Sequence, residues 1–297
     1  MQDNQKAILY ASIAVVSWST VASMFKTALN YYSHYEMLLV ASLTALLVFA
    51  GALTLKKGWK SIGTLKAKDW LWFACVGLVN PLAYYLVLFK AYALLPAQIA
   101  QPINYFWPII LLILLAIFMK KPIAGFKYIG MAFSLAGVAL ISLGSSSLNG
   151  LSLPVSGLAL AFLSAFLWAF YWILNSKNKG INENAALFLS FLFGSLYLLI
   201  GTLFVPVELN SMEGFFSSVY VGLFEMGIPF IFFGLAIRKT NNPALVNQLC
   251  YLSPFISLFL IHIFLGEQIY PTTYGGLAMI VLGIAFNEWF SRKKERI

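Results

Sequence analysis

The residue best placed to do chemistry is Glu225, a carboxylate within an otherwise apolar run. It lies in Gly-Leu-Phe-Glu-Met-Gly-Ile-Pro at 222–229, near the middle of a stretch long enough to cross a membrane. An ionisable side chain at that depth is costly and therefore indicates a functional site. Glu225 could pair with the amine of a substrate or carry a coupled proton. The alternative is a protonated carboxyl group that hydrogen-bonds to a neighbouring helix and stabilises the packing.

A second polar residue, Asn80, occupies the matching position of a related segment. Residues 76–78 read Val-Gly-Leu, as do residues 221–223, and this register places Asn80 opposite Glu225. Both segments are therefore predicted to carry a polar group at the same depth of the membrane.

Three amides follow one another at a spacing of three residues, namely Gln98, Gln101 and Asn104. At this spacing they share one face of a helix, with a slow drift around it. Pro102 and Pro108 each remove a backbone hydrogen bond from the same helix, which a membrane tolerates where the loosened backbone lines a cavity. We therefore expect the amides to face a binding cavity, with polar packing between helices as the alternative.

The segment at 244–265 repeats this pattern. It carries Asn247, and its Tyr-x-x-Pro at 251–254 matches the Tyr-x-x-Pro at 105–108. Two polar, interrupted helices at one depth are the strongest sequence indication of a substrate site in a transporter. The candidate polar contacts are Asn80, Gln98, Gln101, Asn104 and Asn247.

Aromatic residues make up 16% of the chain, and several fall near the middle of apolar stretches rather than at their ends. Aromatic side chains at the ends are typical of a membrane-interface belt. Those in the middle could wall a pocket for a flat or apolar organic molecule, although each alone could equally belong to the packed core. The candidates are Trp18, Tyr84, Tyr85, Tyr105, Trp107, Trp168, Tyr171 and Tyr251.

These residues lie on ten apolar stretches of about 20 residues, the length that spans the hydrocarbon of a bilayer. The chain is 61% hydrophobic and 10% charged, whereas a soluble domain carries more charge. Unbroken apolar runs exclude the alternating pattern of a β-barrel. The sequence therefore predicts an all-α polytopic membrane protein with spans at about 8–28, 36–55, 70–89, 97–118, 124–143, 154–174, 185–205, 215–237, 244–265 and 272–290.

The net charge of +9 is interpreted as an orientation signal and not as a nucleic-acid surface. With the N-terminus in the cytoplasm, 17 of the 19 Lys and Arg residues fall on the cytoplasmic side of the ten spans. This distribution satisfies the positive-inside rule and predicts that both termini are cytoplasmic. Lys26 and Lys90 are the two exceptions; snorkelling to the interface, a gate or contact with a substrate carboxylate would each explain them.

Residues 105–139 repeat at 251–285, with 13 of 35 positions identical in an ungapped alignment. An odd number of predicted spans separates the copies, so the second copy is inverted in the membrane relative to the first. Inverted repeats are typical of secondary transporters, with the substrate site near the midplane between the halves. We therefore divide the chain into a five-helix repeat at 1–146 and an inverted five-helix repeat at 147–297.

Glycines recur seven residues apart in the fifth and tenth spans, as Gly130 with Gly137 and as Gly276 with Gly283. Small residues permit the close approach of membrane helices. These two spans are predicted to form a packing scaffold, and they could also form the face of a homodimer. The sequence leaves monomer and homodimer open.

The sequence lacks the motifs of several enzyme classes. We find no P-loop, no His-Glu-x-x-His, no EF-hand and no Gly-x-Ser-x-Gly motif. No residues have the spacing of metal ligands, and no nucleophile is paired with a base. We therefore expect no metal, no cofactor and no enzymatic activity.

Four short motifs lie on these elements: Trp-Ser-Thr at 18–20 followed by Lys26, Asn-Tyr-Phe-Trp-Pro at 104–108, Trp-Ala-Phe-Tyr at 168–171, and Gly-Glu at 266–267. Together with the duplication they resemble the EamA family of the drug/metabolite transporter superfamily, over almost the whole chain. The resemblance implies ten helices in two inverted repeats with both ends in the cytoplasm. Within the family the segments look most like those of aromatic amino acid exporters, whose central cavity is lined by aromatic residues.

These features predict a secondary transporter of the bacterial inner membrane that exports amino acids or similar small metabolites by alternating access. Its partners would be a small-molecule substrate, the lipid bilayer and, through Glu225, a coupled proton. Two alternatives within the superfamily are export of organic cations or drugs and translocation of a sugar phosphate, which would need Lys26 or Lys90 for the phosphate. A membrane-embedded sensor without transport is a more distant alternative.

Overall fold

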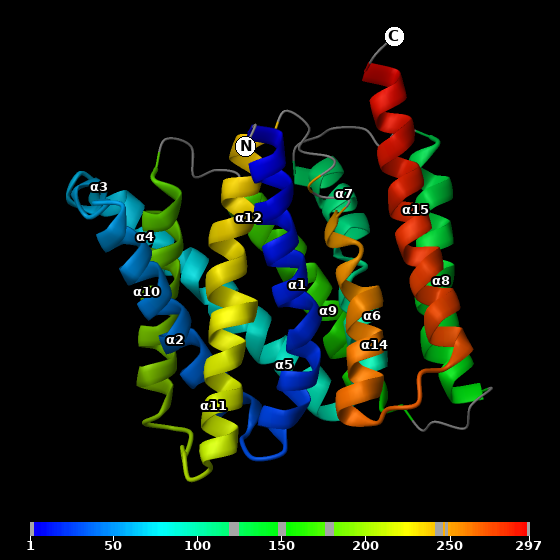
Figure 1. The fold of residues 1–297 in the computed structure, drawn as a ribbon, viewed down its shortest axis with the longest axis horizontal. Coiled ribbons are helices and arrows are strands. Elements are labelled where there is room, and N and C mark those ends of the chain that lie inside the picture. The colour runs from blue at the N-terminus through cyan, green and yellow to red at the C-terminus, as the bar shows by residue number, and fades with distance from the viewer. Residues whose placement is uncertain are drawn as a thin grey trace.

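The computed structural model describes residues 3–118, 125–147, 153–175, 181–240, 246 and 249–295. Within these residues every regular element is a helix, as the sequence predicts (Figure 1). Helices satisfy their own backbone hydrogen bonds, which the interior of a bilayer requires.

The elements of the first half, in chain order, are α1 (Asp3–Leu29), α2 (His34–Leu55), α3 (Lys60–Gly63), α4 (Ala67–Gly77), η1 (Leu78–Ala83), α5 (Tyr84–Leu94), α6 (Ala97–Asn104), α7 (Trp107–Phe118) and α8 (Lys127–Ser147). Those of the second half are α9 (Val155–Asn175), α10 (Glu183–Gly201), α11 (Met212–Val221), η2 (Gly222–Gly227), α12 (Ile228–Lys239), α14 (Ser253–Leu265) and α15 (Pro271–Glu295). The labels η1 and η2 denote short π-helical turns.

In the described part of the chain, 7 helical segments are long and apolar enough to span a membrane. Two of them, Ala67–Leu94 and Met212–Lys239, each contain three consecutive elements. Two further apolar helices, Lys127–Ile141 and Ser253–Leu265, are shorter. That α8, α14 and α15 also span the membrane, which would give ten spans, therefore stays a prediction. The cytoplasmic location of the termini also stays a prediction.

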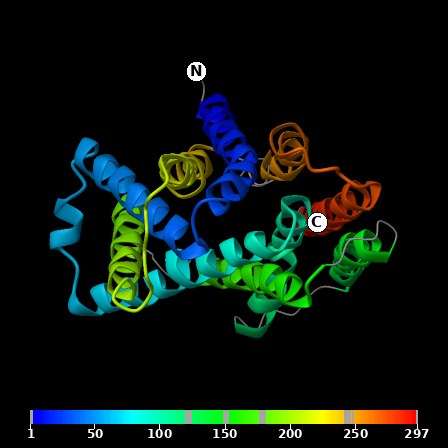
Figure 2. The same cartoon turned by 90° about the horizontal axis from the view of Figure 1, so that it is seen from below.

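The two halves are interleaved in one bundle. Helix α1 of the first half packs against α11, α12 and α14 of the second, and α5 packs against α9. Helices α8 and α15 lie side by side at one edge of the bundle (Figures 1 and 2). Helix α1 begins and helix α15 ends at the same end of the bundle, which we call the near end; the opposite one is the far end (Figure 1).

The glycines of α8 and α15 face one another, as a packing scaffold requires. A Cβ atom on Gly137 would lie 2.5 Å from the carbonyl oxygen of Gly276, and one on Gly276 would lie 2.6 Å from that of Gly137. Gly130 and Gly283 meet in the same reciprocal way. The two backbones thus touch at both glycine pairs. These glycines therefore allow close packing between two helices of the same chain.

Replacing Gly276 with alanine is expected to lower the free energy of unfolding by about 1–3 kcal/mol, because an added methyl group overpacks a tight contact. Gly275→Ala is the matched control on the same helix, since its nearest neighbour, a side-chain carbon of Leu140, would be 3.4 Å away. Thermal unfolding of the purified protein in detergent compares the two variants. Equal melting temperatures for the two variants would show that the close contact at Gly276 does not contribute to the stability of the fold.

Two of the long helices are interrupted at equivalent places by a π-helical turn. The turn η1 separates α4 from α5 and contains Asn80, whose backbone leaves the helical region at φ −141 and ψ 119. The turn η2 separates α11 from α12 and contains Glu225. The sequence register that paired Asn80 with Glu225 is therefore also a structural register. Such turns within α-helices occur frequently at functional sites.

A second pair of interruptions lies where the proline patterns predict it. Helix α6 ends at Asn104 and α7 begins at Trp107, with Tyr105 in the turn between them. Helix α14 begins at Ser253 directly after a turn that contains Tyr251. Both tyrosines thus sit at breaks in the helical backbone.

Candidate functional site

A cavity of about 1140 Å³ lies between the two halves of the bundle. Its described walls come from α1, α5, α6, α7, α9, α10, η2 and α12, and from the turn before α14. Most of the side chains that the sequence singles out meet here: Trp18, Tyr84, Gln101, Asn104, Tyr105, Trp107, Trp168, Tyr171, Glu225 and Tyr251.

Three of the predicted residues do not line this cavity, and a fourth lies outside the described residues. Asn80 is fully buried, and its amide faces the hydroxyl of Tyr171 from behind the wall. Tyr85 is also fully buried and reaches Glu225 from behind. Gln98 points to the far end of the bundle. Asn247 is the residue that the described ranges omit.

Glu225 is held in place by two elements of the first half. The hydroxyl of Tyr85 on α5 donates to its Oε1 at 3.3 Å. The indole N–H of Trp18 on α1 donates to its backbone carbonyl at 3.1 Å. A buried indole N–H needs such an acceptor. The carboxyl group therefore enters the cavity from a turn that both halves of the chain position.

The aromatic wall is built around Trp168 on α9. Its ring centroid lies 4.7 Å from that of Tyr84, 5.4 Å from Tyr171 and 5.7 Å from Phe230. Aromatic pairs at such separations stabilise one another beyond the burial of their area. The wall is therefore a connected aromatic surface and not a set of separate rings.

Some lining residues had not been singled out from the sequence. Trp172 lies one helical turn after Trp168, and its ring stacks on that of Trp107 at 6.2 Å. Phe233 on α12 packs against Trp18 at 5.6 Å. Trp172 follows the predicted residue Trp168 by four positions, so the two share a face of α9. This spacing is the sequence signal that could have identified Trp172. The remaining unpredicted members include Phe25, Tyr92, Phe230 and Cys250.

The amides of α6 divide between two roles. Asn104 donates to the hydroxyl of Ser164 on α9 at 2.9 Å, which ties the end of α6 to the aromatic wall. Gln101 lines the cavity, and its Oε1 is buried without a hydrogen-bond partner among the described residues. A buried acceptor left unpaired is costly, so the amide of Gln101 carries an energetic cost at the cavity wall.

Charged side chains mark the mouth of the cavity at the near end. Lys56 at the end of α2, Glu183 at the start of α10 and Arg238 near the end of α12 line it. Arg238 forms an ion pair with Glu183, and both side chains are a little under half exposed. The cavity therefore reaches solvent at the near end.

At the far end, Lys26 and Glu267 bind the backbone between α5 and α6. The ammonium group of Lys26 donates to the carbonyl oxygens of Tyr92 and Leu95, at 2.9 and 3.1 Å. The carboxylate of Glu267 accepts from the N–H groups of Ala97 and Gln98, at 3.1 and 3.3 Å. A cation at a helix C-terminus and an anion at a helix N-terminus are both favourable.

The side chain of Gln98 completes this connection. It donates to the carbonyl of Gln268 at 2.6 Å and accepts from the N–H of Tyr270 and the hydroxyl of Thr273, both at 3.2 Å. We call Lys26, Gln98 and Glu267 with these backbone partners the clasp. Gln98 and Glu267 join α6 to the segment between α14 and α15, while Lys26 joins α1 to the end of α5 within the first half. Figure 1 shows that loop at the far end.

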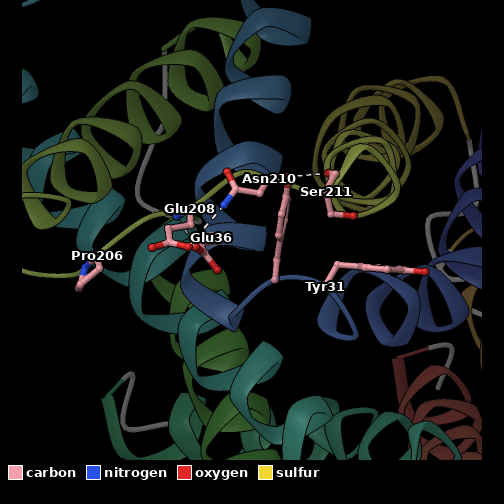
Figure 3. A pocket seen from close by; sticks show the side chains of 7 residues that line it. Tyr31, Glu36, Pro206, Glu208, Asn210 and Ser211 are labelled. Carbon is pink, nitrogen blue, oxygen red and sulfur yellow. Dashed lines mark hydrogen bonds between the residues drawn. The ribbon is translucent and has the colours of Figure 1, made fainter.

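A smaller hollow of about 410 Å³ lies over the start of α2 and the loop before α11 (Figure 3). Its carboxylate Glu36 accepts from the N–H groups of Ser33 at 2.8 Å and of Glu208 at 2.6 Å. The hydroxyl of Tyr32 donates to the carbonyl of Ser211 at 2.7 Å. These groups fasten the loop to α2, so the hollow is explained as a structural junction.

Comparison with known proteins agrees with this architecture. The chain is 24% identical to the uncharacterized transporter YvbV of Bacillus subtilis strain 168, with 94% of this chain and 90% of that protein covered. It is 23% identical to a probable terminal-alkyne amino-acid exporter of Streptantibioticus cattleyicolor, with 94% and 92% covered. An uncharacterized transporter of Archaeoglobus fulgidus is 23% identical, with 94% and 97% covered.

A solved crystal structure has the same fold, with a TM-score of 0.70 over 98% of this chain and 99% of that one, at 19% identity. The model of the EamA-like transporter family matches two segments, residues 5–143 and residues 155–288. Together these segments cover most of the chain. The protein therefore belongs to the EamA-like transporter family.

Proposed function

We propose that the protein is a secondary exporter of amino acids or similar small metabolites, located in the inner membrane of a bacterium with both termini in the cytoplasm. The observation that carries this proposal is the cavity between the halves, in which ten predicted residues meet. Its volume, aromatic walls and few polar groups are typical of sites for small organic molecules. The name of the Streptantibioticus cattleyicolor relative supports an amino acid as substrate.

The mechanism we propose is alternating access. The cavity reaches the near end past Lys56 and Arg238, while Gln98 and Glu267 of the clasp join the two halves at the far end. In a protein of inverted repeats, rocking of one half against the other exchanges the open and closed ends around a fixed site. The structure would then represent the state that loads substrate from the cytoplasm.

In this mechanism the lining residues have different roles in binding the substrate. Glu225 pairs with the amine of the substrate or carries a coupled proton. Gln101 and Asn104, with Asn247 as a further candidate, orient polar groups. The aromatic wall around Trp168 holds the apolar body. Whether the protein acts as a monomer or a homodimer is not part of this mechanism.

The alternative of a sugar-phosphate translocator finds less support. Phosphate recognition needs cationic side chains free to face the ligand. Lys26 is engaged by the carbonyls of Tyr92 and Leu95, and Arg238 is paired with Glu183 at the mouth. An organic cation remains compatible with Glu225 and the aromatic wall. A sensor would bind the same ligands without moving them.

Uptake into liposomes that contain the purified protein tests the proposal. Pooled radiolabelled amino acids and their decarboxylated amines are supplied with and without a pH gradient. We expect saturable uptake, and uptake that follows the gradient would support proton coupling through Glu225. Saturable binding without flux of any compound would instead favour a sensor, and the transport function would be wrong.

A further inference from the structure

The ionisable groups that line the cavity are distributed unevenly. Among the described lining residues, the basic side chains are Lys56 and Arg238, and both lie at the mouth. Glu225 is the acidic side chain in the interior. The neighbouring residues 241–248 contain no Lys, Arg or His. Among the described lining residues, the interior of the site therefore presents a carboxylate without a cationic partner.

Arg238, the mouth cation on the same span as Glu225, is too far away to serve the same small ligand. Arg238 follows Glu225 by 13 residues along η2 and α12, which is about 20 Å at the rise of a helix. An amino acid is much shorter than this distance. With its amine at Glu225, its carboxylate could not reach Arg238, which is already paired with Glu183.

Several neutral donors in the interior are already engaged by other groups of the protein. Asn104 donates to Ser164, and Trp18 donates to the Glu225 carbonyl. The hydroxyl of Tyr105 interacts with Ser253. Within the described chain, Trp172 Nε1 is a buried lining donor without a partner. Neutral N–H and O–H donors offset only part of the cost of dehydrating a carboxylate, whereas a cationic partner would offset more.

The groups that remain are suited to a cation. Glu225 offers a carboxylate, and Gln101 adds an amide to the lining. The connected rings of Tyr84, Trp168 and Phe230 offer electron-rich faces. An ammonium group is attracted to aromatic faces, more strongly when water is excluded. Both charge and surface thus favour an amine and disfavour a second, anionic group on the ligand.

Building on the proposed transport function, we propose that the cavity selects organic amines that carry no free carboxylate. The ammonium group pairs with Glu225, and a flat apolar body lies against the wall around Trp168. For each parent amino acid, the preferred ligand is then its decarboxylated amine, or its derivative with the carboxyl group blocked as an amide or ester.

The two native cysteines provide a binding assay that does not depend on transport. Cys250 lines the cavity, whereas Cys75 is exposed on α4. In a Cys75→Ser variant, a water-soluble maleimide reports access to Cys250, and a bound ligand slows the reaction. Matched ligand pairs differ by one carboxylate: phenethylamine against phenylalanine, with phenylalanine amide, and tryptamine against tryptophan.

We expect the amines and the amide to protect Cys250 at concentrations at least about tenfold lower than the parent amino acids. A Glu225→Gln substitution in the same background should remove this preference. Quenching of intrinsic tryptophan fluorescence by phenethylamine and phenylalanine gives a second measurement on the unmodified chain. Equal or better protection by the amino acids would overturn the selectivity and leave the proposed exporter intact. Absence of binding by any amine would also overturn it, and absence of flux in liposomes would overturn the exporter separately.

Discussion

Replacing Glu225 with glutamine is expected to abolish transport, or to uncouple it from the proton gradient, while the protein still inserts and folds. The substitution keeps the size of the side chain and the hydrogen bond from Tyr85, which an amide oxygen can accept. It removes the negative charge that pairs with an amine. A charge-assisted hydrogen bond contributes about 1.5–3 kcal/mol, so binding should weaken by at least about tenfold.

The measurement is uptake into liposomes at several pH values, with the amount of folded protein checked by size-exclusion chromatography. Glu213→Gln is the matched control, since Glu213 begins the same span on α11 but is exposed at the far end. The control should transport as the unmodified protein does. Normal uptake by Glu225→Gln, with unchanged pH dependence, would show that Glu225 is structural.

Local backbone signals in the sequence predicted much of the fold. The prolines at 108 and 254 predicted the interruptions that expose Tyr105 and Tyr251. The Val-Gly-Leu register predicted the equivalence of Asn80 and Glu225, and both lie in π-helical turns. These features follow from covalent geometry and from the duplication, so one sequence is enough to detect them.

The direction in which each side chain points was harder to predict from the sequence. A spacing of three residues falls about 60° short of a full helical turn at each step, so Gln98 is rotated by about 120° from Asn104. Gln98 therefore bonds to Gln268 and Tyr270 rather than facing the cavity. Only the packing of the second half against α6 determines where each amide points.

Aromatic residues illustrate the same limit. With aromatic residues forming 16% of the chain, composition cannot separate pocket walls from ordinary core. Phe233 is recognised as a wall residue only from the packing of α12 against α1, which places its ring beside that of Trp18. Lys26 likewise gains its role from the end of α5, which lies 66 residues away along the chain.

Breaking the clasp is expected to open the far end of the bundle. A Lys26→Gln, Glu267→Gln double variant removes both charges that bind the backbone between α5 and α6. Charge-assisted hydrogen bonds contribute about 1.5–3 kcal/mol, and about 1.4 kcal/mol changes a conformational equilibrium tenfold. We therefore expect the population open at the far end to rise at least about tenfold, since the Glu267 bonds join the start of α6 to the second half at that end.

Cys250 can report this change, because it lines the cavity. In the Cys75→Ser background, a membrane-impermeant maleimide is applied to intact cells and to inverted vesicles. The double variant should label faster from the outer side and more slowly from the cytoplasmic side. Lys90→Gln is the control, since Lys90 is the other lysine predicted on that side and is exposed on α5. Unchanged labelling from both sides in the double variant would mean that the clasp fastens helix ends without governing which end of the cavity is open.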